Sequence, residues 1–538
     1  MTIEHIINIF VIINFLLFWC YNSYNVSVIM SIYNTGRYLN DSIGSVLNQT
    51  IKFENIQIIL VNDGSIDETE EICLFYKSIF PKNIYYIKTE HSGVSAGRNI
   101  GMKYSLGTFI NFLDPDDKWK HNAFKHILTF FENFTEINFV AGRIKFFELI
   151  NNYHPLDYKF NDTKIININK EYDCIQLSAS SSFFRKSLIE NLTFDEKIFT
   201  GEDTLFINKL LLLKPKYGLV KQAVYFYRKR FDSSSAVQNN KFNIHFYYEN
   251  INFVPNKLVE ISKSLYNKIV PFIQFLIAYE FIFRIQSDIN KYLDSVSFHT
   301  YNILLIEQLK QIDDKYILGQ KCFSNKYKLL ALYIKHNEEL TDNYQIYNNT
   351  LKYMENTIMD LNNENDIIKW RFVYINNNKL HLEGIDNFYI PKVNYFFFCR
   401  LENKTYYPKY IDYPHSDHHF IYGLFKKGRI IVFDIPLSNI KGTEILYFYI
   451  KYINYTLELY TSFTWFSHIA NVPNGYYISE DYIIKIKDNR FIITKNNIIY
   501  RNNRTNDLNK EINDDNLDHP KPLVSDFEDR EDLSKNLI

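Results

Sequence analysis

The amino-terminal part of the chain alternates short apolar runs with amphipathic stretches. The β-branched runs have strand length, and the stretches between them carry apolar side chains at helical spacing. This pattern predicts strands at 26–32, 56–61, 84–87 and 108–113, and helices at 39–47, 67–80 and 95–104. Strands and helices that alternate at this interval favour a mostly parallel α/β sheet with helices on both faces.

Beyond residue 240 the pattern changes twice. Residues 246 to about 352 have helical periodicity, and the apolar run 269–284 is interrupted by polar residues, which favours a buried helix over a membrane span. From 367 to 495, alternation predicts strands of a β-sandwich. The predicted organisation is therefore an apolar segment at 1–25, an α/β domain at 26–240, a helical module at 241–355, a β-rich domain at 366–500 and an acidic disordered tail at 505–538. The β-rich domain could bind an acceptor, mediate oligomer assembly, or only pack against the helices.

The apolar run at 6–21 has three interpretations. It is shorter than the roughly 20 residues that span a bilayer, and it lacks the basic region and cleavage site of a secretory signal. It can be a membrane anchor or interfacial helix, a buried structural helix, or the product of translation from an upstream start.

Composition narrows the class of protein. A formal net charge of −1, with mixed signs along most of the chain, gives no basic field for nucleic acid. The five cysteines are scattered without a CxxC pair, which disfavours a disulfide framework or a zinc site. We therefore expect a cytoplasmic protein, or one at the cytoplasmic face of a membrane, and no nucleic-acid partner.

Polar side chains follow three of the predicted strands at the point where each ends. Ile32 and Tyr33 lie in the segment SIYN after the first strand, Asp63 lies in NDGS after the second, and DPDD follows the fourth. Because carboxyl ends of parallel strands share one edge of a sheet, these groups are expected at a common ligand site. Taken singly, Asp63 is also explained as a turn residue or helix cap, and DPDD as turn chemistry.

Two acidic segments carry candidate chemistry. Asp114, Asp116 and Asp117 offer hard oxygen ligands that suit a divalent cation bridging to phosphates. Glu202 and Asp203 open an apolar helix, where Asp203 is either a cap or a general base for an attacking hydroxyl.

Three further side chains have two interpretations each. Arg98 opens a predicted helix and could pair with a diphosphate or be a solvated helix charge. Arg228 and Ser233 lie in a basic, hydroxyl-rich loop after a strand, which could neutralise a departing diphosphate or be an ordinary solvated loop.

The order of these motifs resembles a known family. IYN, NDGS, SAGRN, LDPDD, GED and YRKR, in this order over residues 26–235, look like the family-2 inverting glycosyltransferases with a GT-A fold. The helical region resembles, less specifically, the extension of family-2 enzymes that build or decorate teichoic-acid-like and capsular polymers. The resemblance implies a GT-A catalytic domain, a nucleotide-diphosphate sugar donor (a UDP-sugar foremost), and a divalent metal, Mn or Mg.

The resemblance also implies a role for each motif residue. On the donor side, Ile32 and Tyr33 would line the nucleoside pocket, Asp63 would meet the base, and Arg98, Arg228 and Ser233 would approach the diphosphate. Asp114 and Asp116 occupy the DxD positions that serve the donor and the cation, with Asp117 as an adjacent candidate ligand. Asp203 matches the catalytic base, with Glu202 as the neighbour that orients a substrate.

The predicted function is metal-dependent, inverting transfer of a sugar from a nucleotide-diphosphate sugar to a hydroxyl of a glycan or cell-surface polymer. Two alternatives remain at this point. One is a non-catalytic glycan-binding or scaffold protein on a degenerate transferase fold, and the other is a sugar nucleotidylyltransferase that makes the donor.

Overall fold

The computed structural model describes residues 24–231, 248–285, 295–323 and 325–336, and a series of strands between 344 and 495. The chain divides into two compact units. The first holds the described residues up to Ile282 and those of Lys291–Phe323, and the second holds Phe283–Asn290 and the residues from Ser324 onward. The apolar run 6–21, the tail 505–538 and Ser233 lie outside the described residues. None of the described helices is long and apolar enough to cross a bilayer.

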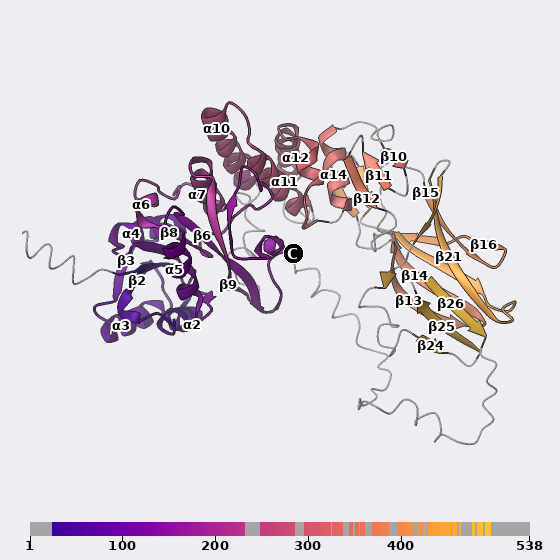
Figure 1. Cartoon of the computed structure of the whole chain (residues 1–538), viewed down its shortest axis with the longest axis horizontal. Coiled ribbons are helices and arrows are strands. Elements are labelled where there is room, and N and C mark those ends of the chain that lie inside the picture. Colours follow the sequence, from indigo (N-terminus) through magenta and orange to yellow (C-terminus); the bar gives the residue numbers. More distant parts are fainter. Residues whose placement is uncertain are drawn as a thin grey trace, which may run out of the picture. The chain divides into compact units, whose positions relative to one another are not determined.

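The first unit is built on the predicted parallel strands. β1 (Val26–Ile32), β2 (Ile56–Asp63), β3 (Ile84–Thr89) and β4 (Phe109–Phe112) pair in parallel in the order β3-β2-β1-β4. α2 (Gly36–Leu47) and α3 (Thr69–Ile79) cover one face, and α4 (Val94–Tyr104) covers the other (Figure 1). The α/β class predicted from the alternation is confirmed, and the carboxyl ends of these strands share one edge.

The sheet continues beyond β4 with a mixed half. Its remaining strands are β8 (Ser182–Arg185), β6 (Phe139–Glu148), β9 (Lys216–Lys229) and β5 (Lys118–Trp119), in the order β4-β8-β6-β9-β5, with β7 (Lys164–Asn167) paired to β9. β8 runs antiparallel to both neighbours. A four-residue strand carries too little periodicity to be detected in sequence, which is why this insertion was not predicted.

A buried amide ties the two halves together. Asn111, on β4, accepts a hydrogen bond from the indole Nε1 of Trp119 at 3.0 Å. Its Nδ2 donates to the carbonyls of Ser180 and Ser182 at 3.0 and 2.8 Å. Asn111 is fully buried, so these bonds fix the segment before β8 beside the carboxyl end of β4.

The helices that follow belong to the first unit, except for the last three residues of α11. They are α10 (Val254–Tyr266), α11 (Pro271–Ile285), α12 (Ser295–Lys310) and α13 (Asp314–Leu318). The hydroxyl of Tyr266 donates to the Leu212 carbonyl, and the ring of Tyr172 contacts Phe275 and Tyr316 edge to face. The predicted boundary near 240 therefore does not separate two compact units, because α10 packs on the helix before it.

Strands begin earlier than predicted in the second unit. The last described helix, α14, spans Asn325–His336, whereas helical periodicity was expected to about residue 352. β10 (Tyr344–Tyr347), β11 (Thr350–Tyr353) and β12 (Asn356–Asp360) form an antiparallel sheet there. Leu351 and Tyr353 are buried at alternate positions, as expected for a strand. The segment continues the aromatic-rich composition of the helical region before it, and for this reason its period of two was mistaken for a helix face.

Two larger antiparallel sheets complete the second unit. The first contains β13 (Ile368–Asn376), β14 (Lys379–Asp386) and β20 (Arg429–Pro436), and the second contains β15 (Tyr395–Leu401), β21 (Thr443–Tyr452) and β26 (Arg490–Lys495). The buried ring of Trp370 contacts Phe433 in its own sheet and Phe448 and Phe491 in the other. The predicted β-rich, sandwich-like part is confirmed.

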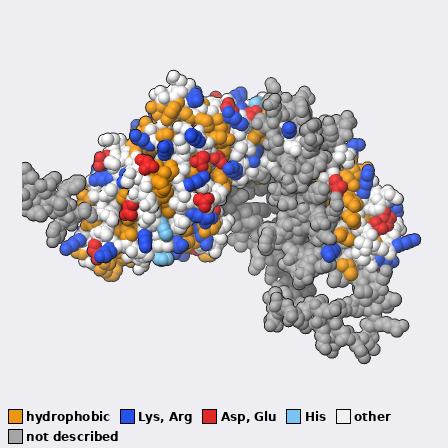
Figure 2. Space-filling view, viewed as in Figure 1, with side chains coloured by type: hydrophobic (Ala, Val, Ile, Leu, Met, Phe, Trp, Pro, Cys, Tyr) orange, Lys and Arg blue, Asp and Glu red, His pale blue; other side chains and the backbone are white. Residues whose placement is uncertain are grey.

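Charged side chains of both signs are interspersed on the visible face of the described residues. Figure 2 shows Lys and Arg mixed with Asp and Glu over the first unit, rather than a continuous field of one sign. This distribution agrees with the formal net charge of −1.

Gly107 lies directly against the backbone of β1. A Cβ at this position would be 2.4 Å from the backbone nitrogen of Ser27. We expect Gly107→Ala to lower the stability of the first unit by about 1–3 kcal/mol, because backbone cannot move aside as a side chain can. Gly44 in α2 has open space around its Cβ position, so Gly44→Ala is the matched control and should stabilise by about 1 kcal/mol or less. Calorimetric unfolding of both variants measures this, and equal shifts would contradict it.

Candidate active site

One buried arginine gathers three carboxylates at the carboxyl edge of the sheet. Arg98, on α4, is 4% exposed. Its Nη1 donates to Asp203 Oδ1 at 2.6 Å and to Glu202 Oε1 at 3.0 Å, and its Nη2 donates to Asp114 Oδ1 at 3.1 Å. Residues that are far apart in sequence, in α4, after β4 and on α7 (Glu202–Leu213), therefore meet around one guanidinium, which we call the Arg98 cluster.

Two glycines allow this convergence. Gly97 packs α4 against β1 so closely that a Cβ would lie 2.2 Å from Ser31 Oγ. Gly201 precedes α7 in a left-handed conformation with φ of 84°, which a residue with a side chain rarely adopts. These positions explain the glycines of the SAGRN and GED motifs. Gly97 lets α4 pack closely against β1, and Gly201 lets the chain turn into α7, so both helices begin near the sheet edge.

Asp203 is held by donors on both oxygens. Arg98 contacts Oδ1, and the backbone N–H of Ala179 donates to Oδ2 at 2.9 Å. Burial raises the pKa of Asp203, and the Arg98 charge opposes that rise. Burial, and then the negative charge of Asp203, raise the pKa of Glu202 to about 7. Each carboxylate oxygen has two acceptor positions, so Asp203 keeps capacity for one more hydroxyl donor.

Asp114 is the most exposed carboxylate of the Arg98 cluster. Its side chain is 31% exposed, compared with 14% for Glu202 and 20% for Asp203. Its Oδ2 accepts a hydrogen bond from Ser180 Oγ at 2.7 Å. Ser180 is positioned by the Asn111 bond described above, so the core determines where Asp114 points.

The neighbouring carboxylates have different environments. Asp117 is 2% exposed and accepts a hydrogen bond from the Arg228 backbone nitrogen at 2.7 Å. Burial, and then the charge of Asp116, raise the pKa of Asp117 well above its usual value. Asp116 Oδ2 instead receives Arg230 Nη2 at 2.6 Å and Nε at 3.1 Å. Asp117 therefore joins β9 to the DPDD turn, whereas Asp116 faces the guanidinium of Arg230.

Arg228 is held by several acceptors within the protein. Its guanidinium donates through Nε to the Asp116 carbonyl at 2.8 Å, through Nη1 to Glu148 Oε2 at 2.5 Å and through Nη2 to Asp41 Oδ2 at 2.8 Å, and the residue is 8% exposed. A role of Arg228 as a diphosphate ligand stays a prediction. Arg230, two residues later, pairs with the Asp116 carboxylate.

Asp63 organises the loop before α4. Its Oδ1 accepts from the Ser92 nitrogen at 2.8 Å and its Oδ2 from the Gly93 nitrogen at 2.8 Å, and His91 Nδ1 lies 2.9 Å from Oδ2. The ring of Tyr33 is stacked on that of His91, with centroids 3.9 Å apart. Asp63 contact with a nucleobase stays a prediction, and its observed bonds build the loop that supports Tyr33.

Sequence reasoning missed several residues of the site. Tyr33, which directly follows β1, is 44% exposed, and Ile32, the last residue of β1, is fully buried. The second arginine of YRKR was the available signal for Arg230. Nothing in the local sequence signalled the partners supplied by tertiary structure, which are Asp41, His91, Glu148, Ala179 and Ser180. Among the residues that the structure describes, no three Asp, Glu, His or Cys side chains are grouped as a metal centre.

Comparisons with known proteins support a common family. Residues 27–193 match the family model described as Glycosyl transferase family 2. The chain is 34% identical over 486 residues to the minor teichoic acid biosynthesis protein GgaB of Bacillus subtilis (strain 168), covering 88% of this chain and 53% of GgaB. It is 35% identical over 326 residues to GgaA of the same organism, covering 59% of this chain and 73% of GgaA. The chain thus spans about half the length of GgaB.

A solved structure has the same fold. The crystal structure of S. aureus TarS aligns with a TM-score of 0.50 at 16% identity, covering 88% of this chain and 85% of that chain. At this identity the likeness concerns the fold, which is an α/β sheet followed by antiparallel sheets.

We expect Arg98→Gln to destabilise the first unit by about 3–5 kcal/mol at pH 8, because it leaves buried carboxylates without their cation. The loss should shrink as the pH falls through the pKa of Glu202, about 7 in the native protein, since protonation then removes charge from the Arg98 cluster. Arg98→Lys keeps the charge and should lose less.

Melting temperatures at pH 8 and pH 5.5 measure this dependence. Arg143→Gln is the matched control, since Arg143 pairs with one carboxylate, that of Asp157, lies over the Tyr153 ring and is 20% exposed. A loss from Arg98→Gln that is independent of pH would contradict the electrostatic account.

Proposed function

The chain belongs to the family-2 glycosyltransferases, and on that premise we propose that it transfers a sugar from a nucleotide-diphosphate sugar to a hydroxyl of a polymer acceptor, with inversion. The observation that carries the proposal is the Arg98 cluster. It joins a candidate base, Asp203, to a candidate donor ligand, Asp114, through one guanidinium. Inverting transfer needs such a base on the side opposite the leaving group. The comparisons do not favour the scaffold and nucleotidylyltransferase alternatives.

The proposed acceptor is a teichoic-acid-type polymer. The names of GgaB and GgaA assign those proteins to minor teichoic acid biosynthesis, and identity to GgaB extends over 88% of this chain. Such polymers carry sugar or polyol units joined by phosphodiesters, so they present many hydroxyls as acceptors.

The proposed donor is a UDP-sugar that lies along the carboxyl edge of the strands. Its base would rest near Tyr33, which has an exposed ring supported by His91. Its diphosphate would lie near Asp114 and Arg230, and Ser233 is kept as a further diphosphate ligand from the sequence motif. Arg98 acts in this proposal as a positioning residue for Asp203, because its bonds described above go to carboxylates.

The residues present fit a divalent cation. Asp114 and Asp116 supply hard oxygen donors, and on Asp116 a guanidinium already occupies a cation's place. We propose these two as the ligands rather than Asp117, whose carboxylate is buried against the Arg228 backbone. When bound, Mn²⁺ or Mg²⁺ would neutralise negative charge on the leaving diphosphate. Arg230, which pairs with Asp116 in the structure, is the basic side chain that could pair with the phosphates.

Residues of the chain itself would take up the proton that the acceptor hydroxyl loses. Asp203 accepts the proton of the acceptor hydroxyl as that oxygen attacks the anomeric carbon. Burial raises the pKa of Asp203, the charge of Arg98 opposes this rise, and the Ala179 N–H holds the second carboxylate oxygen. Glu202, with a pKa of about 7, is suited to hold a hydrogen bond to a sugar hydroxyl beside it.

We expect Asp203→Asn to lower transfer by about 10²- to 10⁴-fold, the usual contribution of a general base, while leaving UDP affinity within about twofold. Transfer is measured by UDP release in the presence of acceptor, and UDP binding by calorimetry. Asp162→Asn, at an exposed carboxylate, is the control. Full transfer activity in a folded Asp203→Asn variant would refute the assignment.

Asp116→Ala should weaken Mn²⁺ binding about tenfold or more, because it removes a charged oxygen ligand. Asp117→Asn should leave Mn²⁺ affinity unchanged and lower the melting temperature, since it affects a buried bond to β9. Electron paramagnetic resonance of free Mn²⁺ measures both affinities without a turnover assay. The reverse outcome, with Mn²⁺ lost in Asp117→Asn alone, would assign the ligand to Asp117.

A further inference from the structure

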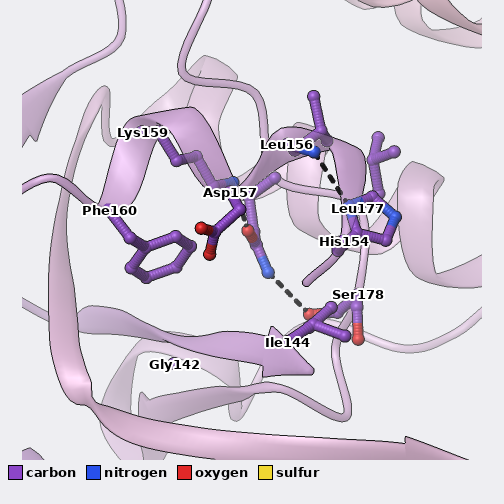
Figure 3. A pocket seen from close by; sticks show the side chains of 10 residues that line it. Gly142, Ile144, His154, Leu156, Asp157, Lys159, Phe160, Leu177 and Ser178 are labelled. Atoms are coloured by element: carbon purple, nitrogen blue, oxygen red, sulfur yellow. Dashed lines mark hydrogen bonds between the residues drawn. The ribbon is translucent and has the colours of Figure 1, made fainter. Parts of the chain in front are cut away.

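A small cavity lies next to the segment that holds Asp203. Its volume is about 40 Å³, and Figure 3 shows its walls. They come from β6, from the 3₁₀ helix Pro155–Phe160 and from the segment before β8. The lining residues are Gly142, Ile144, His154, Leu156, Asp157, Lys159, Phe160, Gln176, Leu177 and Ser178. About three water molecules would fill this space, so it suits a hydroxymethyl group and is too small for a whole sugar ring.

The cavity wall and the candidate base share one segment. Ser178 lines the cavity, and the next residue, Ala179, donates its N–H to Asp203 Oδ2 at 2.9 Å. The carbonyl of Gln176 accepts from Asn208 Nδ2 on α7 at 3.2 Å. The cavity and Asp203 are thus connected through two adjacent residues, Ser178 and Ala179. Arg98 contacts the other oxygen of Asp203, Oδ1, and also donates to Asp114.

The charges in the wall are already paired within the protein. Both oxygens of Asp157 accept from Arg143, at 2.5 and 2.6 Å. Lys159 donates to the carbonyl of Ile175 and to Gln176 Oε1. The rest of the wall is mainly aliphatic and aromatic. An uncharged group with an apolar carbon and a polar oxygen fits such a lining better than an ion.

His154 supplies a neutral donor at this wall. Its Nδ1 accepts a hydrogen bond from the Leu156 nitrogen at 3.1 Å, so the ring proton is on Nε2. Burial, and then the charge of Lys159, lower the pKa of His154 to about 3, which keeps the ring uncharged at neutral pH. No described residue accepts a hydrogen bond from Nε2.

We propose that this cavity is an acceptor subsite that takes the hydroxymethyl group of a polyol or sugar unit beside the reacting hydroxyl. His154 Nε2 donates to the hydroxymethyl oxygen, and Ile144 and Leu177 contact its carbon. The subsite would fix which acceptor hydroxyl reaches Asp203. This proposal rests on the proposed glycosyltransferase function. It assigns acceptor-binding residues within 142–178, a segment that carries no family motif.

Two variants test the subsite in different ways. Ile144→Phe fills the cavity, and His154→Asn keeps an acceptor for the Leu156 nitrogen while removing the Nε2 donor. Lys145→Gln, on the same strand but outside the lining, is the control. The probes are a glycerol-phosphate oligomer and a hexose-phosphate oligomer, and the readouts are KM for each oligomer, KM for UDP-sugar, and UDP release without acceptor.

If the subsite exists, the KM for the oligomer rises about fivefold or more in both variants. His154→Asn loses one neutral hydrogen bond, which accounts for a rise of this size. Ile144→Phe fills the cavity, so the hydroxymethyl group can no longer enter it and make that bond. The KM for UDP-sugar and the acceptor-free release of UDP should be unchanged. An unchanged oligomer KM in both folded variants would overturn the subsite and leave the proposed function standing. If the wild-type protein neither transfers sugar nor releases UDP, the proposed function itself fails. A rise with one oligomer alone identifies which unit supplies the hydroxymethyl group.

Discussion

The arrangement of the site depends on the burial of one positive charge among three negative ones. A guanidinium that is 4% exposed is costly to remove from water, and each of its carboxylates would be costly without it. The cost is offset only when the fork of Arg98 meets Asp114, Glu202 and Asp203 together. The helix α4, the turn after β4 and the start of α7 are thus linked electrostatically, and the remaining site is assembled on this link.

A second set of ion pairs holds the other end of the same edge. Arg228 joins Glu148 on β6 to Asp41 on α2, and its backbone nitrogen bonds to Asp117. With these anchors in place, Asp116 and Arg230 face each other at the end of β9. The two arginines of one short motif therefore have different partners. Arg228 bonds to Glu148 and Asp41, and Arg230 bonds to Asp116.

Hydrogen bonds that start at a buried core residue position the side chains on the proposed acceptor side. Asn111 positions Ser180, Ser180 bonds to Asp114, and Ala179 beside it bonds to Asp203. The same segment forms a wall of the cavity at Ser178. The proposed donor ligand, the proposed base and the cavity are consequently all contacted by residues 178–180, so a change in the packing of this stretch should alter all three at once.

The sequence by itself determined the parallel strands, the helices between them, and the strand-end carboxylates, because these follow from local apolar periodicity and from short polar motifs. It also identified Glu202, Asp203, Asp114 and Asp116 as site candidates. Only the tertiary structure decided that Arg98 bonds to three carboxylates, that Arg228 bonds to Glu148 and Asp41, and that Asp117 is buried. It also supplied Ser180 and His154, which carry no motif. Several of these contacts join residues far apart in sequence, 66 positions for Ser180 with Asp114 and 187 positions for Arg228 with Asp41, and local sequence patterns contain no information on them.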